Sequence, residues 1–143
     1  MRTLDARPGE AWTGLADVHH LWEQLAPARA ALAAAGEQVL RDQIALSTIP
    51  APTGAEQARG EHVAARFRAL GLHGVHRDHV GNVLGVRPGT DDDAPVVLCA
   101  HLDTVFPAGE DVSVRRDGNR LLGPGIVDNA RGLAGMLALA RVI

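Results

Sequence analysis

Hydrophobic positions recur at helical spacing in the first third of the chain and change to a strand-like pattern after it. Alanine and leucine dominate from about residue 15 to residue 46, a stretch that fits two helices. Pro27 suits the first turn of the second helix. The run Ile49-Pro50-Ala51-Pro52 then breaks the helical pattern, because proline has no backbone N–H to donate.

A further helix is predicted to begin at Thr53 and Glu56, which have the spacing of a capping box. Gly71 is placed to end this helix, because glycine readily adopts the left-handed conformation that follows many helix ends. The inner face of the helix is predicted to hold Val63, Phe67 and Leu70.

The following region predicts short strands. They are expected at residues 74–77, 82–86, 112–115 and 120–122. A turn at Asp117-Gly118 separates the last two, and the loop from Pro88 to Pro95, which contains Asp91 to Asp93, is predicted to be a solvated connection. Val96-Val97-Leu98-Cys99-Ala100 is an unbroken apolar run, which is typical of a strand buried on both faces at the centre of an α/β sheet.

The last predicted element is a helix from Asn129 to Ile143. Its apolar face would hold Leu133, Met136, Leu137 and Ala140. Gly132 and Gly135 would let this helix approach a sheet closely. It reaches Ile143 without a stop signal, so we expect it to continue beyond that residue. Together the elements predict a truncated α/β domain, with a mixed sheet flanked by helices.

Composition narrows the classes of function. The 143 residues suit one domain, and 46% hydrophobic residues is enough to form a core. The net charge of -3 and the scattered arginines give no basic stripe that could follow phosphates, so we expect no nucleic-acid partner. The sequence contains no lysine, which excludes Schiff-base chemistry and the lysine of a phosphate-binding loop.

The number of cysteines and the length of the apolar segments indicate the cellular compartment in which the protein is expected. Cys99 is the single cysteine, so it cannot close an intrachain disulfide. Residues 1–14 carry charges and no apolar run of signal-peptide length, and no stretch of the sequence approaches the roughly 20 apolar residues that span a bilayer. We therefore expect a soluble, cytoplasmic protein that does not bind membranes.

Two short segments carry candidate chemistry. His101-Leu102-Asp103 follows the predicted buried strand, and ligands of α/β sheets collect at the carboxyl ends of strands. Asp128 ends a glycine- and proline-rich turn at the start of the last helix. Considered singly, a structural histidine and an aspartate that caps a helix explain these residues better than metal ligands do. A Cys99 and His101 metal pair is a weaker alternative, because Cys99 is predicted to be a small core residue.

Taken together, the segments resemble metallopeptidase family M twenty, which includes glutamate carboxypeptidase, acetylornithine deacetylase, succinyl-diaminopimelate desuccinylase and tripeptidase T. The matching pieces occur in order at residues 49–56, 70–72, 78–83, 97–106 and 123–132. The resemblance implies that His101 binds one zinc ion and that Asp128 bridges two. It gives Asp103 a catalytic supporting role behind His101, and it implies a cis peptide bond between Asp128 and Asn129.

The resemblance also implies a reaction, the hydrolysis of amide bonds in small peptides or N-acyl amino acids. Two zinc ions activate the attacking water, and cobalt or manganese can replace zinc at such ligands. The resemblance places several family features beyond Ile143, namely the remaining metal ligands, the Glu-Glu pair and the dimerisation segment. Because the full-length form would include that segment, it can be a homodimer. Residues 28–143 are therefore predicted to be a partial catalytic domain behind a helical extension, residues 1–27. Alone, the chain is expected to bind zinc weakly and to hydrolyse nothing.

Two rival interpretations remain open. The chain could be a non-catalytic remnant that binds a partner, or part of a di-zinc aminopeptidase of a related family. The histidines at positions 19, 20, 73, 76 and 79 are predicted to face solvent. An incomplete sheet with an exposed apolar helix face also predicts poor solubility.

Overall fold

The computed structural model describes residues 15–89 and 95–143. The expectations for residues 1–14 and for the loop around Asp91 to Asp93 lie outside these described residues. The helices are α1 (Leu15–Gln24), α2 (Ala26–Ala34), α3 (Gly36–Ser47), α4 (Gln57–Ala69) and α5 (Ala130–Val142). The strands are β1 (His73–Arg77), β2 (Val83–Val86), β3 (Arg115–Asp117) and β4 (Arg120–Leu122). This combination confirms the α/β class.

The first helical region holds three helices, so the prediction of two is wrong. Pro27 lies in the first turn of α2, as predicted, and its missing N–H explains why the helix restarts there. The junction between α2 and α3 is nearly continuous, because the N–H of Val39 still donates to the carbonyl of Ala35 at 2.9 Å. The extra boundary is therefore a small local break.

Helix α4 confirms the predicted inner face and contradicts the predicted cap. Val63 and Phe67 are buried, and Gly71 follows the helix with a φ of 75°. However, the helix begins at Gln57, and no side chain caps its first turn. Thr53 instead donates its hydroxyl to the distant carboxylate of Asp103.

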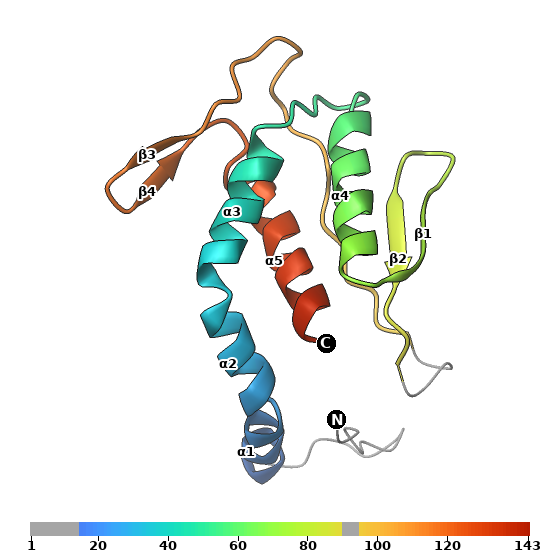
Figure 1. Cartoon of the computed structure of the whole chain (residues 1–143), viewed down its shortest axis with the longest axis vertical. Coiled ribbons are helices and arrows are strands. Elements are labelled where there is room, and N and C mark those ends of the chain that lie inside the picture. Colours follow the sequence, from blue (N-terminus) through green and yellow to red (C-terminus); the bar gives the residue numbers. More distant parts are fainter. Residues whose placement is uncertain (1–14, 90–94) are drawn as a thin grey trace.

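The core lies between three helices. Figure 1 shows α5 between α3 and α4, where Leu133 and Leu137 of α5 are fully buried. Leu46 of α3 and Phe67 of α4 belong to the same buried cluster. The predicted apolar face of α5 is therefore confirmed. The expected approach of Gly132 and Gly135 to a sheet is wrong: a Cβ at Gly132 would collide with the Asn129 side chain, and one at Gly135 would meet open space.

Both predicted strand pairs are present as antiparallel hairpins. β1 pairs with β2, and β3 pairs with β4 around a turn in which Gly118 has a φ of 57°. β3 begins at Arg115, later than the sequence pattern predicts. The β1–β2 hairpin packs against α4, as Figure 1 shows. No helix among the described residues is long and apolar enough to cross a bilayer.

The prediction of a buried central strand at residues 96–100 is wrong. Val96 is 95% exposed and Val97 79% exposed, and neither lies in a strand. Cys99 is also exposed, so the prediction that it is a core residue is wrong. A central strand needs a neighbour on each side, and no strand among the described residues pairs with this segment. Residues 96–99 therefore lie on the surface, and only Ala100 packs against the core.

Candidate metal centre

Alternation along an extended segment places His101 and Asp103 on the outer face. Ala100 and Leu102 pack against the core, and Thr104 is buried. Successive side chains of an extended chain point to opposite sides, so the residues between them project outward. The Thr104 N–H donates to the carbonyl of Ala51 at 2.8 Å, which anchors the segment.

Helix α3 fixes the turn that carries Asp128. Gln43 donates to the carbonyl of Ile126 at 2.7 Å, and Ser47 donates to that of Pro124 at 2.9 Å. The alternative of Asp128 as a helix cap is wrong, because Asn129 occupies the N-cap position of α5. The Asp128–Asn129 peptide bond is cis, as the resemblance implies.

Figure 1 shows that α3 ends and α4 and α5 begin on the same side of the molecule. The segments that adjoin these helix ends bring all three candidate residues together. His101 Nδ1 lies 3.0 Å from Asp103 Oδ1, and His101 Nε2 lies 2.8 Å from Asp128 Oδ1. Asn129 adds a further link, because its amide donates to the His101 carbonyl at 3.1 Å. One imidazole therefore lies between two carboxylates that are 25 residues apart in sequence, at positions 103 and 128.

The electrostatics follow from this geometry. Partial burial would lower the pKa of His101, but hydrogen bonds and charge from Asp128 and Asp103 outweigh it and raise that pKa. The pKa of Asp103 is lowered, first by the hydrogen bond from Thr53 and then by that from His101. An ionised carboxylate only accepts hydrogen bonds, so a ring nitrogen that carries a proton can donate to the carboxylate beside it. Binding a metal ion through Nε2 requires that nitrogen to lose its proton.

The donor set fits zinc in type but not in number. An imidazole nitrogen and a carboxylate oxygen are both zinc ligands, and a carboxylate behind the second ring nitrogen is the usual support for such a histidine. Catalytic zinc uses three protein ligands, whereas His101 and Asp128 offer two. Among the described residues, no group of three or more His, Cys, Asp or Glu side chains is arranged to hold a metal ion.

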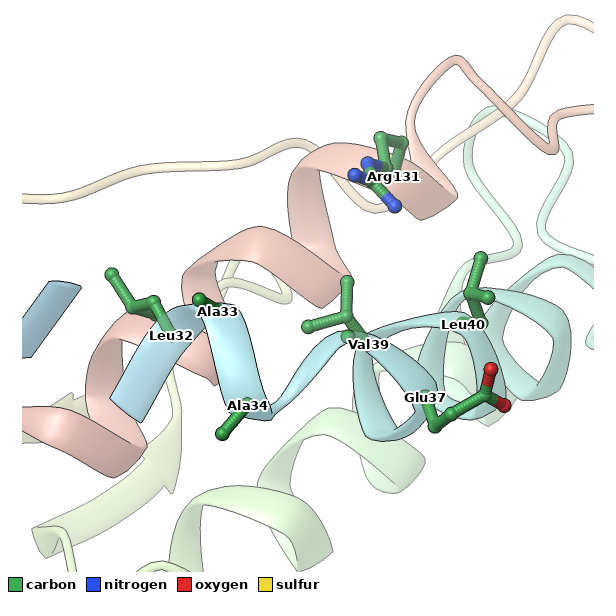
Figure 2. Close-up of a pocket in the computed structure, with 8 residues that line it drawn as sticks. Leu32, Ala33, Ala34, Glu37, Val39, Leu40 and Arg131 are labelled. Carbon is green, nitrogen blue, oxygen red and sulfur yellow. The ribbon is translucent and has the colours of Figure 1, made fainter. Parts of the chain in front are cut away.

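Other predicted candidates lie apart from this cluster. The exposed histidines of α1 and of the β1–β2 hairpin face solvent, as predicted. A surface groove of about 550 Å³ lies at the junction of α2 and α3 (Figure 2). It is lined by Leu32, Ala33, Ala34, Gly36, Glu37, Val39, Leu40 and Arg131. None of the three candidate residues lines it, so we do not assign substrate binding to this groove.

Sequence reasoning missed two residues of the site. Thr53 donates its hydroxyl to Asp103 Oδ2 at 2.7 Å, but its spacing from Glu56 favoured a capping box. Arg59 is buried, and it donates to the carbonyls of Ile49 and Leu102. A signal was present for Arg59, because its position lies four residues before Val63 and therefore on the apolar face of the helix.

A comparison with known protein families finds a similarity in the second half of the chain. The family model of peptidase family M28 matches residues 82–143. The matched region holds β2, the segment with His101 and Asp103, the β3–β4 hairpin, Asp128 and α5. This similarity supports a zinc-type peptidase family, and with it a metal-dependent peptidase activity. The family that matches differs from the one that the sequence motifs suggested.

Proposed function

We propose that this chain forms part of the catalytic core of a metal-dependent hydrolase that cleaves amide bonds in small peptides or N-acyl amino acids. One observation carries the proposal: His101 lies between Asp103 and Asp128, with a carboxylate oxygen within 3.0 Å of each ring nitrogen. This arrangement suits a ligand histidine whose second nitrogen is oriented by a carboxylate. The match to peptidase family M28 over the same residues supports it.

Each residue has a role in the proposed site. Asp103 accepts a hydrogen bond from Nδ1–H of His101 and so favours the tautomer in which Nε2 is available as a ligand atom. Asp128, whose side chain is 85% exposed, offers its carboxylate to metal and solvent. Bound zinc would lower the pKa of a water molecule and polarise the substrate carbonyl. The two-zinc arrangement is part of the proposal, with Asp128 as the shared ligand.

The incomplete ligand set limits what the described residues do. We propose that His101 and Asp128 bind zinc weakly without further ligands, because catalytic zinc uses three protein ligands. Such a reaction also needs a glutamate that accepts a proton from the attacking water, and we propose that this glutamate lies outside the cluster of His101, Asp103 and Asp128. Hydrolysis is therefore proposed for the intact protein and not for these residues alone.

Zinc binding tests the ligand assignment directly. Isothermal titration of the chain with zinc chloride should show weak binding that His101→Ala and Asp128→Ala each reduce by about tenfold or more. His79→Ala is the matched control, because this exposed histidine lies outside the cluster. Zinc binding that survives in both ligand variants and disappears in the control would overturn the assignment.

Assays with N-acylated and free-amine substrates can distinguish an enzyme like those of family M twenty from a di-zinc aminopeptidase. The order of motifs favours family M twenty and N-acylated substrates, whereas the family M28 match keeps a related di-zinc aminopeptidase open. We expect the protein isolated from its native source to hydrolyse N-acyl amino acids and to lose this activity with a chelator. Hydrolysis of free-amine substrates only would favour the aminopeptidase, because such enzymes require the free amine.

A non-catalytic remnant is the second candidate, and the two-ligand site among the described residues favours it. The intact mass of the native gene product separates the two. A mass well above 15.0 kDa would support the hydrolase, with the other ligands supplied by the rest of the protein. A mass of 15.0 kDa would favour the remnant.

A further inference from the structure

Packing does not hold the side chains of the candidate metal centre. The His101 side chain is 53% exposed and that of Asp103 is 35% exposed. A partly exposed side chain keeps several rotamers unless hydrogen bonds select one of them. The orientation of His101 therefore depends on its hydrogen-bond partners, which are Asp128 at Nε2 and the carboxylate and backbone carbonyl of Asp103 at Nδ1. Of the two partners at Nδ1, the carboxylate belongs to a side chain that must itself be held in place.

Both oxygens of that carboxylate have a partner. Oδ1 accepts from His101 Nδ1, and Oδ2 accepts from the Thr53 hydroxyl at 2.7 Å. A hydroxyl that donates to an ionised carboxylate forms a short and strong hydrogen bond. With one oxygen held by Thr53, the other faces the imidazole.

Backbone contacts place Thr53 where it can do this. Pro52 forms a parallel bridge with Thr104, and the Thr104 N–H donates to the carbonyl of Ala51. Arg59 joins the same two segments through the carbonyls of Ile49 and Leu102. The register between residue 53 and residue 103 is therefore fixed by the backbone, and not by the Thr53 hydroxyl itself.

We propose that Thr53 is a positioning residue that holds the Asp103 carboxylate so that His101 presents Nε2 to the metal. The proposal rests on the proposed metal site and adds to it a residue that supports Asp103, which in turn supports His101. Thr53 is free for this role, because no side chain caps the first turn of α4. The hydroxyl acts through Asp103 and touches neither metal nor substrate.

The test compares zinc affinities by isothermal titration of the full chain with zinc chloride. Asp103→Ala should weaken binding by about tenfold to a hundredfold, the usual effect of removing the carboxylate behind a ligand histidine. Thr53→Val keeps the side-chain shape and removes the hydroxyl, so it should weaken binding by about threefold to tenfold. Thr53→Ser retains the hydroxyl and should restore binding. Thr48→Val is the matched control, because its hydroxyl bonds only within α3, to Ile44 and Ala45.

A double substitution separates positioning from a general structural effect. In the Asp103→Ala background, Thr53→Val should leave zinc affinity unchanged, because the group through which Thr53 acts is gone. An equal loss in both backgrounds, or no loss in Thr53→Val alone, would overturn the positioning role while the metal site stands. Absence of zinc binding by the unsubstituted chain would overturn the proposed function, and this role with it.

Discussion

Replacement of Arg59 by methionine tests how the metal-centre segment is held to the core. Arg59 is 1% exposed, and its guanidinium donates to Ile49 O at 3.2 and 2.6 Å and to Leu102 O at 2.8 Å. Burial lowers the pKa of Arg59, and the negative charge of Asp103 opposes this effect. The side chain is thus a buried cation that joins two backbone segments.

The magnitude follows from the two carbonyl groups. Methionine fills much of the same volume but leaves both carbonyls without this donor, at about 1–3 kcal/mol each. Removal of a buried charge offsets part of that loss, because burying a guanidinium is itself unfavourable. We therefore expect Arg59→Met to lower the free energy of unfolding by about 2–4 kcal/mol.

Urea denaturation followed by far-ultraviolet circular dichroism measures this change. Arg68→Met is the matched control, because Arg68 lies exposed on the same helix, and it should change the free energy of unfolding by no more than about 0.5 kcal/mol. The slope of free energy against urea concentration should be the same in all three proteins. If Arg59→Met behaves like the control, the bonds of the guanidinium contribute no net stability and the reasoning is wrong.

Three further predictions concern the core, the pH dependence and the surface. Leu137→Ala should lower the free energy of unfolding by about 3–5 kcal/mol, since Leu137 is fully buried; a loss under about 1 kcal/mol in urea denaturation would place it outside the core. Burial and the charge of Arg66 lower the pKa of His62, while the charge of Asp42 opposes this shift. Protonation of His62 therefore favours the unfolded chain, so stability that is present above about pH 6.5 is lost as the pH falls towards the folded-state pKa. The urea midpoint of His62→Gln should therefore vary less between about pH 7 and pH 5, and equal variation would contradict this. Val97→Glu should reduce concentration-dependent association measured by light scattering, and a monodisperse monomer of the unsubstituted chain would contradict it.

Much of the secondary structure follows from local sequence. The turn at Gly118 and the buried faces of α4 and α5 appear where turn residues and periodicity predict them, although β3 begins at Arg115, later than the pattern predicts. These features depend on residues within a few positions of one another, so the sequence pattern contains the necessary information. The run from Val96 to Ala100 does not follow this rule. Its apolar composition matches a buried strand, but burial requires neighbouring strands that the local pattern does not specify.

The site also combines residues that local motifs indicate with contacts that only the fold decides. The motifs around His101 and Asp128 indicate candidate ligands, and the fold brings these two side chains to 2.8 Å. Thr53 was predicted to cap a helix, and it bonds to Asp103 instead. A hydroxyl donates to the acceptor that packing brings nearest, and that acceptor lies 50 positions away in sequence.

The sequence alone determined the apolar helix faces, the hairpins and the residue types available to a metal. The tertiary structure decided which of these residues meet. It placed Asp128 against His101 rather than at the cap of α5, and it buried Arg59 beneath the carbonyl of Leu102. Spacing along the chain fixes which side of an element a residue occupies. Hydrogen-bond partners depend on how distant elements pack together, and packing is a property of the whole fold.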